Sequence, residues 1–509
     1  MNFVFLSFDS AKILRDLCID KTIRAAFCGP GALLHCLHLT DAVNTKMSDY
    51  QRNMVAPLAS IAEKTLIRGA TIISMDPQVG NLVSGDILLS GSKIVAIGEH
   101  LDADGAHVIE AKDMIVIPGM VDTHRHSWEG QLRRINPNAQ TLEDYCNATH
   151  FSFAKYYRPR DIYVGNMITA LGCIDAGITT VIDNSHNSRT GEHSDAAVEA
   201  LLDTGIRAIH ASGAPVSGTW DSAHWPGNLA RVQDKYFKNN PEGLVTLAAM
   251  AQLEPKLWAE ARRLGIPIVT EFFGGAMAAE LEALHRDGLL RNDNIFNHCT
   301  SLPDTGWEIL REAGVRVNVC PRSDAHYGIE DGRFAWGAAE RHGIRPGLSV
   351  DNETSYSGDM FGEMRVAFYL QRLIGAHDPG CGHKHHAAKP LDPHRLLEAA
   401  TLDGAACAGL EDRIGSLTPG KQADLVLIRT SDLNVYPSNN AFGTVVHAAE
   451  RSNVDTVIIG GRIVKQSGVV LGVDQVQLKA AIDESCAHLY QAAGYSPEPF
   501  ARTFAPLTQ

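Results

Sequence analysis

The feature that most constrains the fold is a series of eight short apolar segments separated by helical patterns. The segments are IVIPGMVDTH, ITTVID, IRAIHA, LVTLAAM, IPIVTE, NIFNHC, VRVNVC and RPGLSVD. Between them lie stretches such as DAAVEALLDTG, EPKLWAEARRLG and LPDTGWEILREAG, and the last two end on the glycine that commonly follows a helix. Strands that alternate with helices predict a parallel α/β sheet, and eight of them predict a closed (β/α)8 TIM-type barrel. An open, doubly wound sheet is the alternative, but no GxGxxG follows the first strand.

The sequence on either side of the barrel predicts a small β-sandwich domain formed from both ends of the chain. Short β-rich runs separated by Gly, Asp and Pro begin near Lys64. A similar pattern occurs near the other end of the chain, in GKQADLVLIRTSD and VDTVIIGGRIVKQSG. Met47 is an alternative start, so the sequence leaves open whether the first 46 residues belong to the native protein. The predicted parts are a partly disordered N-terminal extension, the composite β-sandwich, the barrel and a C-terminal helical tail, at residues 1–62, 63–114 with 418–475, 115–417 and 476–509.

Charge and composition exclude some classes of function. The formal net charge is −14, and no run of Lys or Arg offers the basic surface that nucleic acid requires. No apolar stretch reaches the roughly 20 residues of a membrane helix, and the first residues do not resemble a secretory signal. The ten cysteines contain no CxxC pair, which predicts reduced thiols in a cytoplasmic protein. The expected partner is a small-molecule substrate.

Ionisable side chains interrupt the apolar strands near their carboxyl ends. The first strand ends in His124-Arg125-His126, and two residues spaced by one point the same way in an extended strand. The carboxyl ends of all eight strands meet on the face of a barrel where its chemistry takes place. Burying several such groups by chance would be costly, so we predict that they form a site. The residues at these positions are His124, His126, Asp183, His210, Glu271, His298 and Asp351.

The residue types at the strand ends fit a divalent metal ion. Imidazole and carboxylate ligands suit Zn²⁺, which we favour, with Fe²⁺ or Mn²⁺ as alternatives, and the sequence allows one ion or two. Such a metal activates a water at a free coordination position. We predict that Asp351 contacts the metal and accepts a proton from that water, and that His298 binds the metal or polarises the bond that is cleaved.

At these residues the chain resembles the amidohydrolase superfamily, in particular its triazine hydrolases and its cytosine, guanine and adenosine-type deaminases. The resemblance covers residues 64–473 and rests on PGMVDTHRH, GITTVID, NHCTSLPDTGWEILREAGVRVNVCPRSD, LSVDNETSYSGDMFGEMRVA and AATLDGAACAGLEDRIGSLTPGKQADLVLI. It implies a (β/α)8 barrel with a β-sandwich made from both termini, and a homo-oligomer such as a dimer or tetramer. It also implies that His124, His126 and Asp351 bind metal and that His298 binds metal or substrate.

The fifth strand departs from the pattern of that family. In this branch the strand normally ends in a metal-binding histidine within an HxxE pair, but here Glu271 takes the place of the histidine and Gly274 that of the acid. A shift of register would instead make Glu271 the acid and leave the strand without a histidine. The missing pair puts simple amine deamination in doubt, because its glutamate shuttles a proton in the deaminases. We favour Glu271 as a metal ligand or as a bridge between two ions, and the alternative is a buried structural acid.

Aromatic and histidine residues near the strand ends are candidates for binding the substrate. The long segment after the first strand is rich in aromatic residues and could cover the substrate or pack as a helical excursion. Phe272 and Phe273 follow Glu271 directly, although aromatic residues are often simply core. His326 could orient the substrate or lie on the surface. The predicted substrate-binding residues are Trp128, Phe272, Phe273, His326 and Tyr327.

The sequence therefore predicts a metal-dependent hydrolase that cleaves a carbon–nitrogen bond, other than a peptide bond, in an amide, cyclic amide or heteroaromatic substrate. An alternative is an aminohydrolase or dehalogenase of a heterocycle that uses Glu271 as its proton shuttle. A third hypothesis is a barrel without metal that serves as a binding subunit. The substrate itself stays open, because fold and metal site do not determine it.

Overall fold

The structure is a computed structural model, and it describes residues 54–56, 61–102, 104–221, 224–240, 242–330, 334–377, 391–502 and 504. All of these residues belong to one unit of the chain, Met54–Gln509. The predicted N-terminal extension lies almost wholly outside the described residues. No helix among the described residues is both long enough and apolar enough to cross a membrane.

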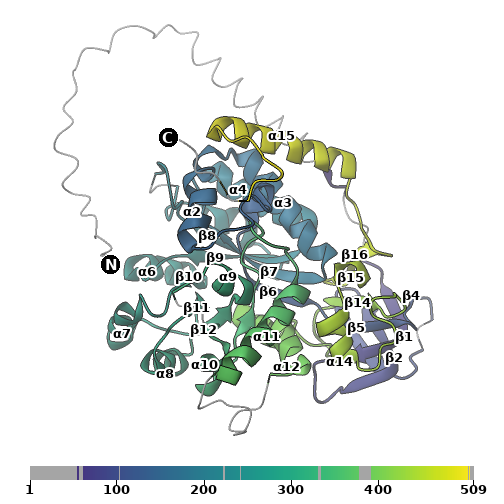
Figure 1. Cartoon of the computed structure of the whole chain (residues 1–509). Helices are drawn as coiled ribbons and strands as arrows, with labels where there is room; N and C mark the ends of the chain where they lie inside the picture. The colour runs from purple at the N-terminus through teal and green to yellow at the C-terminus, as the bar shows by residue number, and fades with distance from the viewer. Residues whose placement is uncertain are drawn as a thin grey trace, which may run out of the picture. The chain divides into compact units, whose positions relative to one another are not determined.

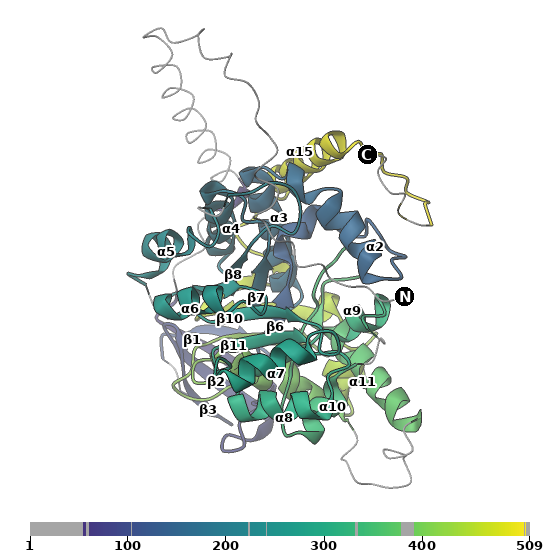
Figure 2. The same cartoon turned by 90° about the vertical axis from the view of Figure 1, so that its left-hand side faces the viewer.

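Eight strands form a parallel sheet that confirms the predicted barrel (Figure 1). Each strand pairs in parallel with the one that precedes it in the chain. Helices surround the sheet in both views (Figures 1 and 2). The strands are β6 (Met120–Arg125), β7 (Ile178–Ser185), β8 (Arg207–Gly213), β9 (Val245–Met250), β10 (Ile268–Phe272), β11 (Asn294–His298), β12 (Arg316–Val319) and β13 (Gly347–Leu348).

The first and last strands of the barrel meet beyond the end of β13. Arg125 and Asp351 form an isolated parallel bridge. The Asp351 amide donates to the His124 carbonyl at 2.9 Å, and the His126 amide donates to the Asp351 carbonyl at 2.8 Å. The buried Arg125 guanidinium reinforces the junction, because it donates to Glu353 Oε1 at 3.0 Å and to the Gly358 carbonyl at 3.1 Å. Closure of the barrel thus places residues of β6 beside Asp351.

A second sheet of nine strands combines segments from both ends of the described chain (Figure 1). Its central contact is the antiparallel pairing of β5 with β14. An apolar cluster that includes Ile67, Ile87, Leu425 and Ile458 is buried in this sheet. The strands are β1 (Lys64–Ile73), β2 (Asn81–Ser90), β3 (Lys93–Gly98), β4 (His107–Glu110), β5 (Met114–Pro118), β14 (Leu425–Arg429), β15 (Val454–Ile459), β16 (Arg462–Gln466) and β17 (Val469–Val470).

One predicted strand is divided between the two sheets. The segment IVIPGMVDTH was expected to form a single barrel strand, but β5 ends at Pro118 and β6 begins at Met120. Gly119 lies at the crossing, where a Cβ atom would come within 2.0 Å of Thr179 Oγ1. Only glycine fits so close to β7, so the chain changes sheets at this residue. The strand β5 therefore belongs to the nine-stranded sheet and not to the barrel.

The helices follow the sequence signals closely. α4, α6 and α8 end at Gly205, Gly265 and Gly314, which adopt the left-handed conformation that glycine tolerates at a helix C-terminus. An apolar cluster that includes Trp258, Trp307 and Trp336 is buried between the barrel strands and the helices. The α-helices are α2 (Leu142–Cys146), α3 (Pro159–Asp175), α4 (Gly191–Thr204), α5 (Leu229–Val232), α6 (Pro255–Leu264), α7 (Ala278–Arg286), α8 (Asp304–Ala313), α9 (Pro321–His326), α10 (Trp336–Arg341), α11 (Met360–His377), α12 (Pro393–Glu398), α13 (Gly404–Ala408), α14 (Ala441–Gly443) and α15 (Gln475–Ala493).

Candidate functional site

The structure brings together five of the side chains predicted from the strand ends. Two of the five imidazoles and carboxylates come from β6 and the residue after it, and the others come from β10, β11 and the segment after β13. All are buried or nearly so, since even the most exposed side chain, Glu271, is 12% accessible. The five residues are His124, His126, Glu271, His298 and Asp351.

Four donor atoms of this cluster converge on one point. Asp351 Oδ1 lies 3.2 Å from His124 Nε2 and 3.2 Å from His126 Nε2. Glu271 Oε1 lies 3.6 Å and 3.7 Å from the same two nitrogens. Ligand atoms about 2.0–2.2 Å from a tetrahedral zinc lie about 3.3–3.6 Å from one another. The observed separations therefore match the ligand shell of a small divalent ion, and His124 Nε2 has no hydrogen-bond partner among the residues that the structure describes.

Neighbouring groups hold both imidazoles with Nε2 toward the carboxylates. His126 Nδ1 lies 3.0 Å from the Asn184 carbonyl, which can only accept, so Nδ1 carries a proton and Nε2 is the nitrogen that a metal ion would use. The side-chain amides of Asn184 and Asn297 contact Nδ1 of His124. The carbonyl acceptor on the far side of His126 is typical of metal sites, because it fixes the ring.

The electrostatics of the cluster also favour a cation. Burial raises the pKa of Asp351, but the imidazoles of His124 and His126 outweigh burial and hold that pKa well below its usual value. Burial likewise raises the pKa of Glu271, but the imidazoles of His124, His298 and His126 outweigh burial and lower that pKa to about 2. Burial lowers the pKa of His126, yet Asp351 and Glu271 raise it to about 10. Two ionised carboxylates thus retain protons on nearby imidazoles, and a divalent cation would take the place of those protons.

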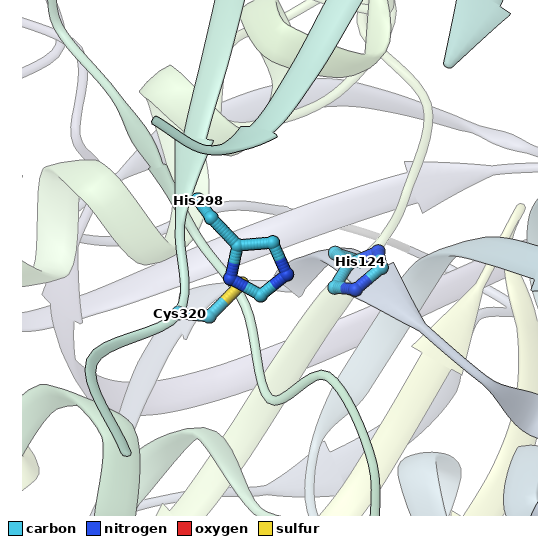
Figure 3. A group of neighbouring side chains, drawn as sticks. All are labelled: His124, His298 and Cys320. Atoms are coloured by element: carbon cyan, nitrogen blue, oxygen red, sulfur yellow. The ribbon is translucent and has the colours of Figure 1, made fainter. Parts of the chain in front are cut away.

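His298 extends the cluster on the side of Glu271. Its Nε2 lies 3.3 Å from Glu271 Oε2, and its Nδ1 lies 2.8 Å from Asp324 Oδ1. Figure 3 shows the His298 ring between Cys320 and His124, with the sulfur at the end of the ring away from His124. His298 has a φ of 67°, an uncommon value for a residue with a side chain, and it is therefore held by its surroundings.

Cys320 gives a second possible grouping with His124 and His298. Burial raises the pKa of the Cys320 thiol above its usual value, although His298 lowers it. The sulfur also lies 2.9 Å from Ser349 Oγ, so the thiol already has a partner. Because the thiolate is the form that binds metal, the set of two histidines and two carboxylates is the better candidate.

The other two strand-end residues pair with each other. Asp183 Oδ2 lies 2.8 Å from His210 Nδ1, and both side chains are fully buried. The other carboxylate oxygen of Asp183 accepts from the Ser127 amide at 3.3 Å. Asp183 therefore positions the chain directly after His126.

A cavity of about 380 Å³ opens onto the cluster. His126, Glu271, His298 and Asp351 all line it. A volume of this size is typical of small-molecule sites. Most of the remaining wall is apolar or aromatic, and it includes Leu142, Tyr145, Pro215, Val216, Trp225, Met250, Phe273 and Ile329.

Only Phe273 among the predicted substrate-binding residues lines this cavity. Phe272 is on the opposite face of β10 and stacks on Phe296 with ring centroids 4.6 Å apart. Trp128 is fully buried behind the wall, with its ring 5.9 Å from that of His186. These positions correct the expectation for Phe272 and Trp128, which are core residues.

The two predicted residues after the seventh strand also lie outside the cavity wall. The Tyr327 hydroxyl donates to Asn352 Oδ1 at 3.0 Å and is buried there. His326, at the end of α9, is partly exposed and packs edge-on against Tyr356 at 5.8 Å. Both residues support the segment that follows Asp351.

Sequence reasoning missed two histidines on the cavity wall. His186 stacks on His126 with ring centroids 4.3 Å apart, and His150 packs against His186 at 4.5 Å. Burial lowers the pKa of His150 to about 3 and lowers the pKa of His186 well below its usual value. Both rings are therefore neutral hydrogen-bonding groups. The aromatic segment after β6 was the available signal, because Tyr145 and His150 both belong to it.

The structure explains why the acid of the HxxE pair is missing. A Cβ atom on Gly274 would come within 2.6 Å of the Thr300 carbonyl and of Leu302 Cβ. The segment after β11 lies this close because His298, Cys299 and Ser301 all have positive φ angles. No side chain fits at Gly274 unless this segment moves.

Comparison with known proteins shows which family and which enzymes the chain is similar to. The sequence model of the amidohydrolase family matches residues 263–464. The chain is 26% identical over 458 residues to a 5-methylthioadenosine/S-adenosylhomocysteine deaminase from Desulforamulus reducens, covering 84% of this chain and 99% of the relative. It is 27% identical over 459 residues to the corresponding deaminase from Symbiobacterium thermophilum, with coverage of 84% and 99%.

Solved structures share the fold. An adenosine deaminase from Xanthomonas campestris with bound zinc has a TM-score of 0.72 at 22% identity, covering 86% of this chain and 100% of that chain. The atrazine chlorohydrolase from Arthrobacter aurescens, in complex with zinc, has a TM-score of 0.72 at 22% identity, with coverage of 83% and 100%. The predicted resemblance to the amidohydrolase superfamily is confirmed, and with it the predicted class of enzyme.

Proposed function

We propose that this amidohydrolase-type hydrolase uses a divalent metal ion, zinc in the first place, to cleave a carbon–nitrogen bond of a heterocyclic or cyclic amide substrate. The observation that carries the proposal is the convergence of His124, His126, Glu271 and Asp351 at separations of 3.2–3.7 Å. These four residues would hold the ion. When bound, such an ion acts as a Lewis acid and makes a water molecule more acidic.

Asp351 is the residue best placed to accept a proton at this site. Its Oδ1 faces the two imidazoles, and its Oδ2 accepts from the Ser323 hydroxyl. The low pKa of Asp351 keeps the carboxylate ionised at neutral pH, which a proton acceptor requires. Ser323 fixes the carboxylate so that Oδ1 stays turned toward the cluster.

His298 is placed to steady negative charge on the substrate. Burial lowers the pKa of His298, but Cys320, Asp324 and Glu271 outweigh burial and raise it well above its usual value. The ring lines the cavity, and its Nε2 faces Glu271 Oε2 at 3.3 Å. A fixed donor in a buried site stabilises developing charge more than one in water does.

The cavity wall supports a flat, largely apolar substrate. Tyr145, Trp225 and Phe273 offer aromatic surface, and the neutral rings of His150 and His186 offer hydrogen bonds without charge. A purine, a triazine or a cyclic amide has this combination of apolar faces and polar edges.

Deamination is the second candidate, and the curated relatives favour it, because those proteins are named as deaminases. In that case Glu271 would be the proton shuttle. Gly274, at the usual position of the acid, has no room for a side chain, so no residue there could take this role in place of Glu271.

The test is turnover by the zinc-loaded full-length protein. We expect a product of ring or amide hydrolysis, seen by mass spectrometry as the gain of one water without release of ammonia. The panel would contain cyclic amides, triazines, adenosine and 5-methylthioadenosine, with ammonia measured in parallel. Ammonia release from an amino-substituted ring would favour deamination instead. Failure to bind metal and to turn over any substrate would support a binding subunit.

A cytoplasmic location and a homo-oligomeric state belong to the same proposal. The ten cysteines without CxxC pairs, read as reduced thiols, support the location. The assembly rests on the family resemblance alone, and sedimentation of the purified protein would test it.

A further inference from the structure

A second cavity, of about 690 Å³, lies apart from the metal-binding cluster and is strongly polar. Its wall contains five arginines and only three carboxylates, although the chain as a whole carries a net charge of −14. None of the residues that line the first cavity takes part. The arginines are Arg133, Arg134, Arg322, Arg365 and Arg451.

Two of these arginines are fully engaged within the protein. Arg322 pairs with Glu363 at 2.5 Å and donates to the Ser357 hydroxyl at 2.9 Å. Arg133 pairs with Glu353 Oε2 at 2.7 Å and donates to the Ile168 carbonyl at 3.0 Å. Their role is to shape the wall.

The other three arginines keep unused donors. The only ionic partner of Arg134 among the described residues is Glu353 Oε2 at 3.6 Å, and its guanidinium makes no hydrogen bond there. Arg451 approaches Asp175 at 3.3 Å and is mostly exposed. Arg365 donates to two backbone carbonyls, at 3.2 Å and 3.3 Å, and forms no ion pair within the described part of the chain.

The single negative charge of Glu353 faces more than one guanidinium group. Arg133 and Arg134 both approach this one carboxylate, at 2.7 and 3.6 Å, and Arg125 approaches it at 3.0 Å but has a second carboxylate of its own in Asp122 at 2.7 Å. Burial lowers the pKa of Arg134, Glu353 opposes this, and the like charges of Arg133 and Arg451 lower the pKa further. A further anion in the cavity would relieve this repulsion.

The backbone holds Arg134 in an uncommon conformation. Its φ is 57°, and its amide donates to the Glu353 carbonyl at 2.9 Å. A residue with a side chain at positive φ costs free energy and is kept where the surrounding structure requires it. Here the conformation holds Arg134 on the wall of the cavity.

We propose that this cavity binds the phosphate group of a small phosphorylated molecule, with Arg134, Arg365 and Arg451 as the donors. Guanidinium groups match phosphate oxygens with paired hydrogen bonds, and a phosphate dianion would offset the local excess of positive charge. The volume leaves room for an organic group attached to the phosphate. This site is independent of the proposed hydrolysis.

The experiment is isothermal titration of the full-length, zinc-loaded protein with inorganic phosphate and with glycerol 2-phosphate at low ionic strength. We expect both anions to bind, and the double variant Arg134→Gln/Arg451→Gln to weaken binding by about tenfold or more, since hydrogen bonds to charged groups are lost. Both residues are more than half exposed, so the variant should fold, and its circular dichroism would show this. Arg68→Gln, which removes an exposed arginine of β1, is the matched control and should bind like wild type.

Three results would overturn the proposal. The first is the absence of binding by wild type. The second is equal binding by wild type and the double variant, which would put the anion elsewhere, for example at the metal. The third is a wild type that binds no phosphate while the double variant changes its oligomeric state, which would make the cavity a protein interface.

Discussion

Glu271 Oε2 lies 3.3 Å from His298 Nε2, while the other oxygen of the same carboxylate faces His124 and His126. One side chain on β10 therefore contacts both parts of the cluster. A histidine at this position would offer a single nitrogen to the metal. The carboxylate adds a negative charge to the metal site and at the same time fixes the ring of His298.

The first prediction concerns metal content. We expect about one equivalent of metal in purified wild type and little in Glu271→Ala, because the variant lacks one of four ligands. Elemental analysis of both proteins gives the answer. Glu254→Ala is the control, since Glu254 lines the same cavity without contacting the cluster. Metal retained by Glu271→Ala would contradict a ligand role, and two equivalents in wild type would indicate a bridged pair of ions.

The second prediction concerns metal removal. Chelation should lower the thermal midpoint of wild type, because it leaves two buried carboxylates without their cation, and added zinc should restore the midpoint. A ligand present at 100 to 1,000 times its Kd stabilises the folded state by about 3–4 kcal/mol. Differential scanning calorimetry measures the shift. The chelator should leave Glu271→Ala unchanged, and an equal shift in both proteins would argue against this site as the source.

The third prediction concerns Gly274. Its replacement by alanine should lower the free energy of unfolding by about 1–3 kcal/mol, because the new Cβ overlaps the segment that follows His298. Displacement of that segment should also reduce kcat. Gly98→Ala is the matched control, since its nearest contact would be an ordinary 3.4 Å. Urea denaturation and turnover measurements on both variants would show whether only the substitution at Gly274 lowers stability and kcat.

The fourth prediction concerns the ion pair between the two sheets. Arg207 begins β8, and its guanidinium contacts Asp424 at 2.7 Å with both side chains almost fully buried. Asp424→Asn should cost about 3–5 kcal/mol, because it leaves a buried charge without a partner. Glu260→Gln, which breaks the exposed pair with Arg263, should leave the unfolding midpoint unchanged. Similar effects of the two substitutions would contradict this account.

The fifth prediction concerns pH. Burial, with smaller contributions from Asp351 and Glu271, raises the pKa of Glu129 to about 8, although His126 and Tyr145 oppose this. Folding therefore favours the protonated acid, and this stabilisation is lost as pH rises from the ordinary value of 4.5 through about 8. In metal-free protein, Glu129→Gln should remove this part of the pH dependence.

Unfolding curves of wild type and Glu129→Gln at a series of pH values would test the effect. The two proteins should have similar free energies of unfolding near pH 4.5. Wild type should become the less stable of the two by a few kcal/mol near pH 8, because one unit of pKa corresponds to about 1.4 kcal/mol. Parallel pH profiles would show that the carboxyl group of Glu129 titrates normally.

The barrel and the strand-end residues were predictable because their signals are local. Apolar strands, helix-ending glycines and an ionisable residue near the ends of six of the eight strands are all visible in short windows of sequence. The metal ligands remain a prediction, but the structure places the side chains of His124, His126, Glu271 and Asp351 together. Gly119 shows the limit of local signals, since only its distance to Thr179 explains why the chain changes sheets there.

The cavity wall was poorly predicted because it depends on contacts between distant segments. Phe272 could have been excluded by strand alternation alone, since Glu271 faces the cluster and the next side chain must face away. His150 and Trp225 could not have been found in the same way. They reach the cavity from long segments after β6 and β8, whose paths depend on packing.

Arg125 has a consequence for the engineering of this chain. It stands between two predicted ligands on the first strand, yet it holds Glu353 and the carbonyl of Gly358 in the segment after the last strand. Loops above a barrel are usually the parts that can be exchanged to create new specificities. Here residues 351–358 cannot be grafted freely, because a change in their length would move the first and last ligands relative to each other. Diversity is better introduced between Leu142 and His150, which contribute to the cavity wall, than nearer β6, where Arg134 and Asn136 donate to the Glu353 and Thr354 carbonyls.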